Sequence, residues 1–246
     1  MSEFSGKVAL VTGSSSGIGE AIARRLSALG AAVVINSAKS VEAGERIAAE
    51  LGKDAIYLQA DISDKAAGER LLAATVERFG RIDILVNNAA HQDSFKDLEE
   101  VTDEEWQRTF ATNIHAMFYL AKAAVPHMAA GGAIINTASI NADMPNPTLL
   151  AYATTKGAIQ NFTGGLAQML AKKGIRVNCV APGPVWTPLI PASMAGEKVA
   201  RFGQDYPMGR PAQPVELAAA YVMLAEPMAS YVSGATVAVT GGKPLI

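Results

Sequence analysis

Short apolar runs rich in β-branched residues alternate along the chain with longer stretches in which apolar positions recur at helical spacing. In the first of these longer stretches, Ile22, Leu26 and Leu29 form one apolar stripe. Runs of the first kind predict strands, and stretches of the second kind predict helices. Strands are expected at residues 8–11, 32–36, 55–59, 82–86, 133–137, 176–180 and 236–239. Helices are expected at residues 17–29, 41–51, 64–79, 102–128, 151–173 and 214–224.

This alternation predicts an α/β fold of the Rossmann type, a doubly wound parallel sheet of about seven strands with helices on both faces. Because the chain has 246 residues and no internal repeat or linker, residues 1–246 are interpreted as a single domain. Residues 183–211 show neither pattern and are rich in proline, methionine and bulky residues. An irregular stretch of that length inside a compact domain is expected to be a binding loop or lid.

Polar and glycine-rich segments follow several of the predicted strands. They are residues 12–19, Asp61, residues 87–90, Ser139 and residues 182–187. In sheets of this kind, ligands bind beyond the carboxyl ends of the strands, which meet at one edge. We therefore expect these segments to converge on one site.

Composition narrows the classes of function. Half of the residues are hydrophobic, yet no uncharged apolar stretch reaches the ~18 residues of a membrane span. The formal net charge of −2 gives no field that would attract nucleic acid or an anionic membrane. The single cysteine, Cys179, lies in an apolar run and is interpreted as a buried structural thiol of a cytoplasmic protein. No signal peptide is evident, and three histidines with one cysteine predict no metal site.

A glycine-rich turn follows the first predicted strand and precedes the first predicted helix. It reads Thr12-Gly13-Ser14-Ser15-Ser16-Gly17-Ile18-Gly19. Glycines at this spacing permit a tight turn, close approach of the backbone to a pyrophosphate, and close packing of the helix on the strand. Free N–H groups at the helix N-terminus also favour phosphate. A plain glycine turn is the alternative, but the strand–turn–helix context favours a dinucleotide site.

Tyr152 and Lys156 are four residues apart in a predicted helix and therefore project from one face of it. The ordinary pKa of tyrosine, about 10, makes a free phenol a poor acid or base at neutral pH. A neighbouring cation stabilises the phenolate and brings proton transfer into a useful range. Because such pairs also arise by chance, the other candidate residues in the chain decide how the pair is interpreted. Ser139 ends a predicted strand, and Asn113 stands in mid-helix, where its side chain competes with the backbone.

In combination, these features closely resemble the short-chain dehydrogenase/reductase family, in the family's order and spacing, from Lys7 to Gly242. The resemblance rests on the glycine turn, Asn87-Asn88-Ala89, Asn113, Ser139, the pair Tyr152 and Lys156, and Pro182-Gly183. It implies a dinucleotide-binding oxidoreductase that acts on CH–OH groups. The implied reaction transfers a hydride between a nicotinamide cofactor and a carbonyl or alcohol, and reduction of ketones or aldehydes is expected. Within the family, the chain resembles the carbonyl reductases, the 3-oxoacyl reductases and the glucose dehydrogenases.

The resemblance assigns the reaction to four residues. Tyr152 would be the general acid in carbonyl reduction, or the base in alcohol oxidation. Lys156 would lower the pKa of Tyr152 and hold the nicotinamide ribose, while Ser139 would donate a hydrogen bond to the substrate carbonyl. Asn113 would disrupt its helix locally and hold a water molecule that links Lys156 to solvent. The cofactor would supply the hydride.

NADP(H) is expected in preference to NAD(H), because the second predicted strand lacks the terminal acid that would bind the ribose 2′-hydroxyl of NAD. Asn36, Ser37 and Lys39 stand there instead and could hold a 2′-phosphate. Lys39 is equally interpretable as a solvated loop lysine, and many NADP-dependent relatives have a basic residue where this chain has Ser16.

Further cofactor contacts follow from the resemblance. Asp61 matches the residue that contacts adenine, although a helix N-cap is the alternative interpretation, and Thr187 matches the residue that holds the nicotinamide carboxamide. Ala90 replaces the usual glycine, so a modest change in pocket shape is expected. The full set expected at the cofactor is Gly13, Ser15, Ser16, Gly17, Ile18, Gly19, Asn36, Ser37, Lys39, Asp61, Ile62, Asn88, Ala89, Ala90, Tyr152, Lys156, Pro182, Gly183, Val185 and Thr187.

The substrate pocket is expected to be lined by residues that follow the strands and by residues 183–211. The candidates are mainly apolar, which favours a medium-sized ketone or aldehyde over a charged metabolite. His91 is interpreted as a wall or surface histidine rather than a base. The candidates are His91, Asn141, Met144, Trp186, Leu189, Met194, Phe202 and Tyr206.

Three alternative functions stay open: an NAD(P)-dependent sugar or polyol dehydrogenase, a 3-oxoacyl-carrier-protein reductase, and a non-enzymatic nicotinamide-binding sensor. Residues 127–132 lack the lysine or arginine that relatives use to dock carrier protein. Small residues in the helix 151–173 would permit close approach across a two-fold axis, and the resemblance implies a homotetramer. The expected partners are a small-molecule substrate and copies of the chain, with no nucleic acid and no membrane.

Overall fold

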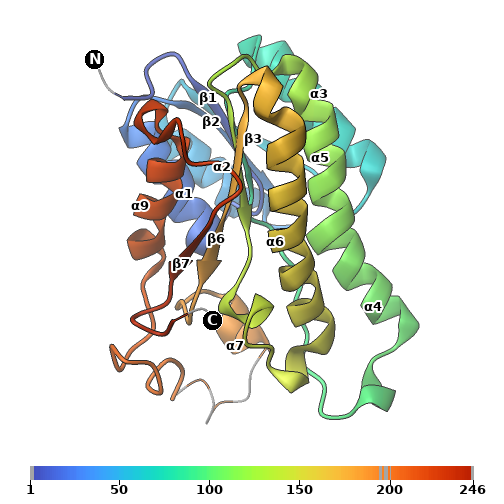
Figure 1. The fold of residues 1–246 in the computed structure, drawn as a ribbon. Helices are drawn as coiled ribbons and strands as arrows, with labels where there is room; N and C mark the ends of the chain where they lie inside the picture. Colours follow the sequence, from blue (N-terminus) through green and yellow to red (C-terminus); the bar gives the residue numbers. More distant parts are fainter. Residues whose placement is uncertain (1–2, 194–195, 197–198, 200, 245–246) are drawn as a thin grey trace.

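The computed structural model describes residues 3–193, 196, 199 and 201–244. Seven parallel strands form one sheet in the order β3-β2-β1-β4-β5-β6-β7, flanked by helices (Figure 1). This is the strand order of a doubly wound sheet, with its switch point between β1 and β4, and it confirms the predicted fold class. The strands are β1 Val8–Val11, β2 Ala32–Ser37, β3 Ala55–Gln59, β4 Ile84–Asn87, β5 Ala133–Thr137, β6 Arg176–Pro182 and β7 Thr236–Val239.

The predicted strand bounds are confirmed for β1, β3, β5 and β7. β2 and β6 extend further than predicted, to Ser37 and Pro182. β4 begins at Ile84 instead of residue 82. At its entrance the carboxylate of Asp83 accepts a hydrogen bond from the backbone N–H of Val8 at 3.0 Å and so takes a donor that the ladder would otherwise use.

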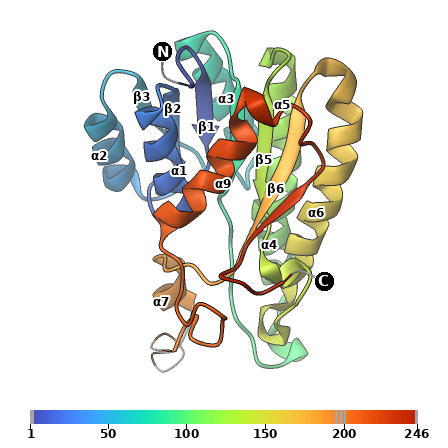
Figure 2. The same cartoon turned by 60° about the vertical axis from the view of Figure 1, so that its left-hand side comes forward.

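Helices cover both faces of the sheet (Figures 1 and 2). On one face, α1, α2 and α9 pack together through buried residues such as Ile22, Ile47 and Leu217. On the other face, α3, α5 and α6 pack through residues such as Leu71 and Leu120. Each fully buried side chain of this size contributes about 1.5–3 kcal/mol of transfer free energy. The helices are α1 Gly17–Ala28, α2 Val41–Leu51, α3 Lys65–Phe79, α5 Ala116–Ala124, α6 Leu150–Leu170 and α9 Pro214–Ala225.

The helices predicted at 17–29, 64–79, 151–173 and 214–224 differ from α1, α3, α6 and α9 only at their ends. Two other predicted segments differ from the structure in more than their end residues. The single helix predicted at 102–128 consists of α4 Asp103–Phe110, a π-helical turn at Ala111–His115, α5, and a 3₁₀ turn at Val125–His127 that contains Pro126. The stretch predicted to be irregular, 183–211, contains the short helix α7 Leu189–Ser193. None of the described helices combines the length and the apolar character needed to cross a membrane.

Candidate active site

A cavity of about 1440 Å³ lies at the carboxyl ends of the strands, where the segments that follow β1 to β6 meet. The predicted convergence on one edge is therefore confirmed. Every predicted cofactor residue except Gly19 lines the cavity, and so do Ser139, Tyr152 and Lys156. The predicted substrate residues that line it are His91, Asn141, Met144, Leu189, Phe202 and Tyr206. Met194 lies outside the described residues.

The glycine turn is shaped for close approach. Gly13 and Gly17 have φ values of +63° and +58°, which disfavour any other residue. A Cβ at Gly13 would lie 2.8 Å from Cα of Ala89, and a Cβ at Gly19 would overlap the carbonyl oxygen of Gly13. Gly19 thus packs α1 against the turn instead of lining the cavity. Since α1 begins at Gly17 on the cavity wall, its free N–H groups and positive dipole end fit a pyrophosphate.

Thr12 and Asn88 fasten the end of β4 to this turn. The hydroxyl of Thr12 accepts hydrogen bonds from the backbone N–H groups of Asn88 at 3.0 Å and Ala89 at 3.1 Å. The amide of Asn88 donates to the carbonyl oxygen of Thr12 at 2.9 Å. Ala90 follows with an ordinary backbone, because no non-glycine residue in the described ranges has positive φ. The alanine therefore causes no backbone strain at this position.

Tyr152 and Ser139 form a hydrogen-bonded pair on the cavity wall. Burial raises the pKa of the Tyr152 phenol, and the hydrogen bond with Ser139 opposes that rise. The Ser139 oxygen also accepts a hydrogen bond from the backbone N–H of Asn141 at 3.1 Å, which fixes its position. The phenol is consequently protonated at neutral pH.

Lys156 lies close to the phenol ring of Tyr152. Its Nζ lies 5.2 Å from the centroid of the Tyr152 ring and donates to the carbonyl oxygen of Thr137 at 2.7 Å. Only 2% of Lys156 is exposed, and burial lowers its pKa to about 7. In the protein alone, burial therefore sets the direction of the Tyr152 pKa, and the role of Lys156 in lowering that pKa stays a prediction.

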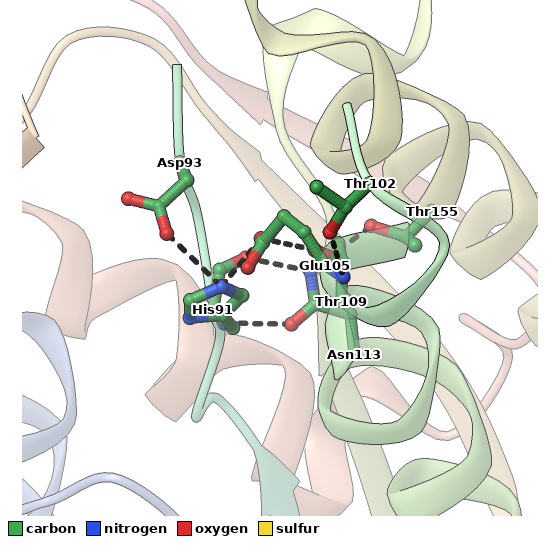
Figure 3. Close-up of polar contacts among 7 residues, drawn as sticks. All are labelled: His91, Asp93, Thr102, Glu105, Thr109, Asn113 and Thr155. Atoms are coloured by element: carbon green, nitrogen blue, oxygen red, sulfur yellow. Dashed lines mark hydrogen bonds and ion pairs between the residues drawn. The ribbon is translucent and has the colours of Figure 1, made fainter. Parts of the chain in front are cut away.

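Asn113 lies in the π-helical turn, which confirms the predicted local disruption of its helix. Its side chain does not line the cavity. Its Oδ1 accepts from the backbone N–H of His91 at 2.8 Å, and its Nδ2 donates to the carbonyl oxygen of His91 at 3.0 Å (Figure 3). Nδ2 also donates to the hydroxyl of Thr155 at 3.0 Å. The amide of Asn113 therefore supports the site from behind, and its water-holding role stays a prediction.

The end of β2 differs from the expected phosphate site. Asn36 is 1% exposed, and its Nδ2 donates to the carbonyl oxygens of Leu58 at 3.1 Å and Ala60 at 3.2 Å. The hydroxyl of Ser37 is bonded to that of Tyr57 at 2.9 Å. Both polar groups are thus engaged inside the fold, although both residues line the cavity. Lys39 is exposed there, and its ammonium has no hydrogen bond or ion pair within the described part of the chain.

Asp61 and Asp64 have different roles beyond β3. The carboxylate of Asp61 accepts hydrogen bonds from the backbone N–H and hydroxyl of Ser63, at 3.0 and 2.7 Å, and lines the cavity. Asp64 is the N-cap of α3, with its Oδ1 2.6 Å from the backbone nitrogen of Ala67. The alternative interpretation of Asp61 as a helix N-cap is therefore wrong. That interpretation failed because three polar residues, at positions 61, 63 and 64, stand close together before α3, and the sequence alone does not show which of them caps the helix.

Trp186 is the predicted substrate residue that the structure does not place on the cavity wall. Its ring is 41% exposed and lies 6.4 Å from that of Phe202, which does line the cavity. The wall is also more polar than predicted. Arg108 lines it one helical turn before Thr112, which also lines it. Other lining residues come from irregular segments, where no periodic pattern could have indicated them. They include Gln92, Asn146, Arg201, Asp205 and Lys243.

A group of titratable side chains lies beside the cavity, where the sequence predicted no metal-ligand cluster. One ligand atom each of His91, Asp93 and Glu105 lies within 4.8 Å of the others. The distance from His91 Nε2 to Glu105 Oε1 is 2.7 Å, and to Asp93 Oδ2 it is 3.4 Å (Figure 3). The sequence-based prediction considered only histidines and cysteines, whereas the fold brings the carboxylates of Asp93 and Glu105 next to His91.

Relatives of this chain are known oxidoreductases. A family model described as enoyl-(acyl carrier protein) reductase matches residues 13–243. The glucose and ribitol dehydrogenase of Daucus carota is 45% identical over 98% of this chain and 86% of its own length. The chloroplastic NADPH-dependent aldehyde reductase 1 of Arabidopsis thaliana is 45% identical over 96% of this chain and 85% of its own length.

Solved structures resemble the fold closely. A short chain dehydrogenase from Burkholderia cenocepacia J2315 in complex with NADP has a TM-score of 0.91 and 34% identity, with 98% of both chains covered. A 3-ketoacyl-(acyl-carrier-protein) reductase from Brucella melitensis complexed with NADH has a TM-score of 0.90 and 36% identity, with 97% of this chain and 98% of the other covered. Both of these proteins hold a nicotinamide dinucleotide.

Proposed function

Since this chain belongs to the short-chain dehydrogenase/reductase family and is an oxidoreductase acting on CH–OH groups, we propose that it reduces ketones or aldehydes with NADP(H). One observation carries the proposal. The hydrogen-bonded hydroxyls of Tyr152 and Ser139 stand with Lys156 on the wall of a cavity that also includes the glycine turn. The proton donor Tyr152, the hydrogen-bond donor Ser139 and the dinucleotide-binding turn therefore line the same cavity.

The cavity walls fit a nicotinamide dinucleotide. The glycine turn and the start of α1 would hold the pyrophosphate, and Asp61 with Ile62 would contact the adenine. Asn88, Ala89 and Ala90 would pass along the cofactor, as would Pro182, Gly183, Val185 and Thr187 at the other wall. When bound, the cofactor supplies the hydride of the reaction.

The residues of the chain manage the oxygen and the proton of the substrate. Ser139 donates a hydrogen bond to the substrate carbonyl oxygen and stabilises the charge that develops there. Tyr152 then delivers its phenolic proton to the same oxygen as the alcohol forms. Lys156, held by the carbonyl oxygen of Thr137, would hold the nicotinamide ribose and would return a proton towards Tyr152. Because its pKa is about 7, Lys156 is present in both its charged and its neutral form near neutral pH, as proton transfer requires.

The charge state of Tyr152 favours reduction over oxidation. A pKa raised by burial keeps the phenol protonated at neutral pH. The protonated phenol is the form that donates to a carbonyl, whereas alcohol oxidation begins with the phenolate. The protonated phenol therefore supports the proposed role of Tyr152 as proton donor in ketone or aldehyde reduction.

NADP(H) is proposed as the preferred cofactor, with NAD(H) as the second choice. No acid stands at the end of β2, so nothing there repels a 2′-phosphate or captures a 2′-hydroxyl in its place. Because Asn36 and Ser37 are engaged inside the fold, the exposed ammonium of Lys39 is the main candidate partner of the phosphate. The relatives solved with NADP and with NADH support both cofactors.

Oxidation or reduction of a sugar or polyol is the second candidate function. Its support is the polar wall near the catalytic pair, where His91, Gln92, Asn141 and Asn146 all line the cavity. Such groups suit a substrate with several hydroxyls. The relative named glucose and ribitol dehydrogenase agrees with this candidate.

We also propose a cytoplasmic homotetramer. In α6, a Cβ added at Gly164 or Gly165 would meet no atom within 4 Å, so this part of the helix surface is open for close approach by a second copy. Met169 on the same helix and Phe118 on α5 are 77% and 46% exposed. Sedimentation analysis of the purified protein tests the assembly.

The test of the function is turnover with NADPH on a panel of ketones, aldehydes and oxidised sugars, measured for the wild type and for Tyr152→Phe. The proposal expects the wild type to reduce carbonyls and the variant to lose nearly all turnover while it still binds NADPH. A variant that keeps full turnover would contradict the assigned role of Tyr152. NADPH binding without any turnover in the wild type would favour the sensor alternative.

A further inference from the structure

Glu105 is fixed on α4 by several contacts beside the active site (Figure 3). Its Oε1 lies 2.7 Å from Nε2 of His91 and accepts a hydrogen bond from the hydroxyl of Thr109 at 3.0 Å. The backbone N–H of Glu105 donates to the hydroxyl of Thr102 at 3.2 Å. The Glu105 side chain is only 13% exposed, so solvent competes little for its carboxylate. The carboxylate therefore holds the imidazole of His91 in one place.

His91 is attached to the same continuous helical segment a second time, through its backbone. Asn113 accepts from the N–H of His91 and donates to its carbonyl oxygen, at 2.8 and 3.0 Å. The residue is thus held at its ring by Glu105 and at its main chain by Asn113. Any displacement of the ring acts directly on the backbone that Asn113 binds, next to Ala90 on the cavity wall.

Asn113 extends this series of bonds to the catalytic helix. Its Nδ2 donates to the hydroxyl of Thr155 at 3.0 Å, and that hydroxyl donates to the carbonyl oxygen of Tyr152 at 2.7 Å. Thr155 is fully buried and immediately precedes Lys156. Hydrogen bonds, joined by the covalent frame of His91, therefore connect the carboxylate of Glu105 to the backbone of Tyr152.

We propose that Glu105 is a positioning residue for the reaction, acting through His91 and Asn113 on the placement of Tyr152 and Lys156. The inference rests on the proposed function. Because an ionised carboxylate only accepts hydrogen bonds, the ring of His91 carries its proton on Nε2. A displacement of about 1 Å at a reacting group costs ~10²-fold in rate, so partial loosening of this series is expected to cost about tenfold.

The same three side chains meet the distance requirement of a cation site, but their atoms are already used. A nitrogen that donates its proton to Glu105 has no lone pair for a metal, and Oε1 of Glu105 already accepts from two groups. Asp93 is 47% exposed and more distant, at 3.4 Å. The hydrogen-bonded arrangement accounts for the cluster, and a chelator separates the two interpretations.

The kinetic test compares Glu105→Ala and Glu105→Gln with the matched control Glu104→Ala. Glu104 neighbours Glu105 on α4, is exposed, and has no side-chain partner in the described ranges. Glu105→Ala is expected to lower kcat about tenfold with the NADPH dissociation constant nearly unchanged. Glu105→Gln keeps an acceptor and is expected to recover most of kcat, while Glu104→Ala matches the wild type. Equal kcat in Glu105→Ala and the wild type, per folded molecule, would overturn the inference.

A second measurement needs no variant of the cluster. Ring ¹⁵N spectra of the wild type, assigned with His115→Gln and His127→Gln at two exposed histidines, are expected to show His91 as a single Nε2–H tautomer that EDTA does not alter. A rapidly averaged ring, or a signal that EDTA changes and Zn²⁺ restores, would overturn the inference. Absence of wild-type turnover with a normal His91 signal would instead refute the proposed function.

Discussion

The ammonium of Lys156 donates a hydrogen bond of 2.7 Å to the carbonyl oxygen of Thr137, the last residue of β5. The bond joins the catalytic helix α6 to the strand end from which Ser139 projects. It is made by a side chain that burial holds at a pKa of about 7. Lys156 therefore both attaches α6 to β5 and exchanges a proton. Its titration should affect the free energy of unfolding as well as the reaction rate.

Replacing Lys156 with methionine is expected to flatten the dependence of stability on pH. Between a folded pKa of about 7 and an ordinary value of 10.5, the unfolded chain binds more protons than the folded one. The contribution of Lys156 to stability therefore rises with pH across this window, and its destabilising effect is full below about pH 7. Urea unfolding of both proteins without cofactor, at about pH 6.5, 8 and 9.5, measures it. A wild-type minus variant difference that is constant with pH would contradict the assignment.

Lys39→Asp is expected to reverse the cofactor preference. The substitution removes the exposed cation at the end of β2 and introduces the acid that captures a ribose 2′-hydroxyl and repels a 2′-phosphate. Fluorescence titration should show the ratio of the NADPH and NADH dissociation constants shifting by about tenfold or more, equivalent to ~1.4 kcal/mol. Lys53→Asp, at an exposed lysine outside the cavity, should leave that ratio unchanged. An unchanged ratio in Lys39→Asp would place the phosphate elsewhere.

Asp61→Ala and Asp64→Ala are expected to separate binding from stability. Asp64→Ala removes the N-cap of α3 and should lower the free energy of unfolding by about 1 kcal/mol, with dinucleotide affinity unchanged. Asp61→Ala removes a side chain on the cavity wall and should weaken dinucleotide binding more than it lowers stability. Thermal unfolding and cofactor titration of both variants check this. The reverse assignment of the two effects would restore Asp61 as the cap.

Asp83→Ala is expected to destabilise the fold by about 2 kcal/mol, because it leaves the N–H of Val8 and two cations without their acceptor. Burial tends to raise the pKa of Asp83, but hydrogen bonds from Arg81, Val8 and Lys7 together hold it below the ordinary value of 3.8. This stability is present above the ordinary pKa and is lost as pH falls through the folded one. Acid unfolding tests it, with exposed Asp54→Ala as the control.

The periodicity of the sequence was sufficient for the sheet and most helices, because buried strands and amphipathic helices carry their own patterns. The local disruption at Asn113 could be predicted for a related reason, since a helix-disfavouring residue in mid-helix marks the π-helical turn that the structure contains. The direction of the Tyr152 pKa could not be predicted from the sequence. That direction depends on how deeply the phenol is buried and on its hydrogen bond with Ser139, and a local pattern in the sequence gives neither.

Two other parts of the site depend on contacts between segments that are distant in the chain. The sequence predicts that Asn36 is available to a phosphate, but in the structure its amide donates to the carbonyl oxygens of Leu58 in β3 and of Ala60 just after it. Lys243 reaches the cavity from the C-terminal segment, where its Nζ lies 5.5 Å from the centroid of the Tyr206 ring. Local sequence patterns encode neither the partners of Asn36 nor the position of Lys243. The structure was therefore needed to place this cation on the cavity wall.

The packing of α1 against α9 has a consequence for the biosynthesis of the protein. Ile22 and Leu26 of the first helix share one buried cluster with Leu217 and Tyr221 of the last long helix. While the ribosome is still making the middle of the chain, the first helix lacks its cover and exposes an apolar face. We therefore expect the nascent chain to need chaperone protection until residues 214–225 emerge, and the dinucleotide cradle to become competent only after they have packed on the first helix.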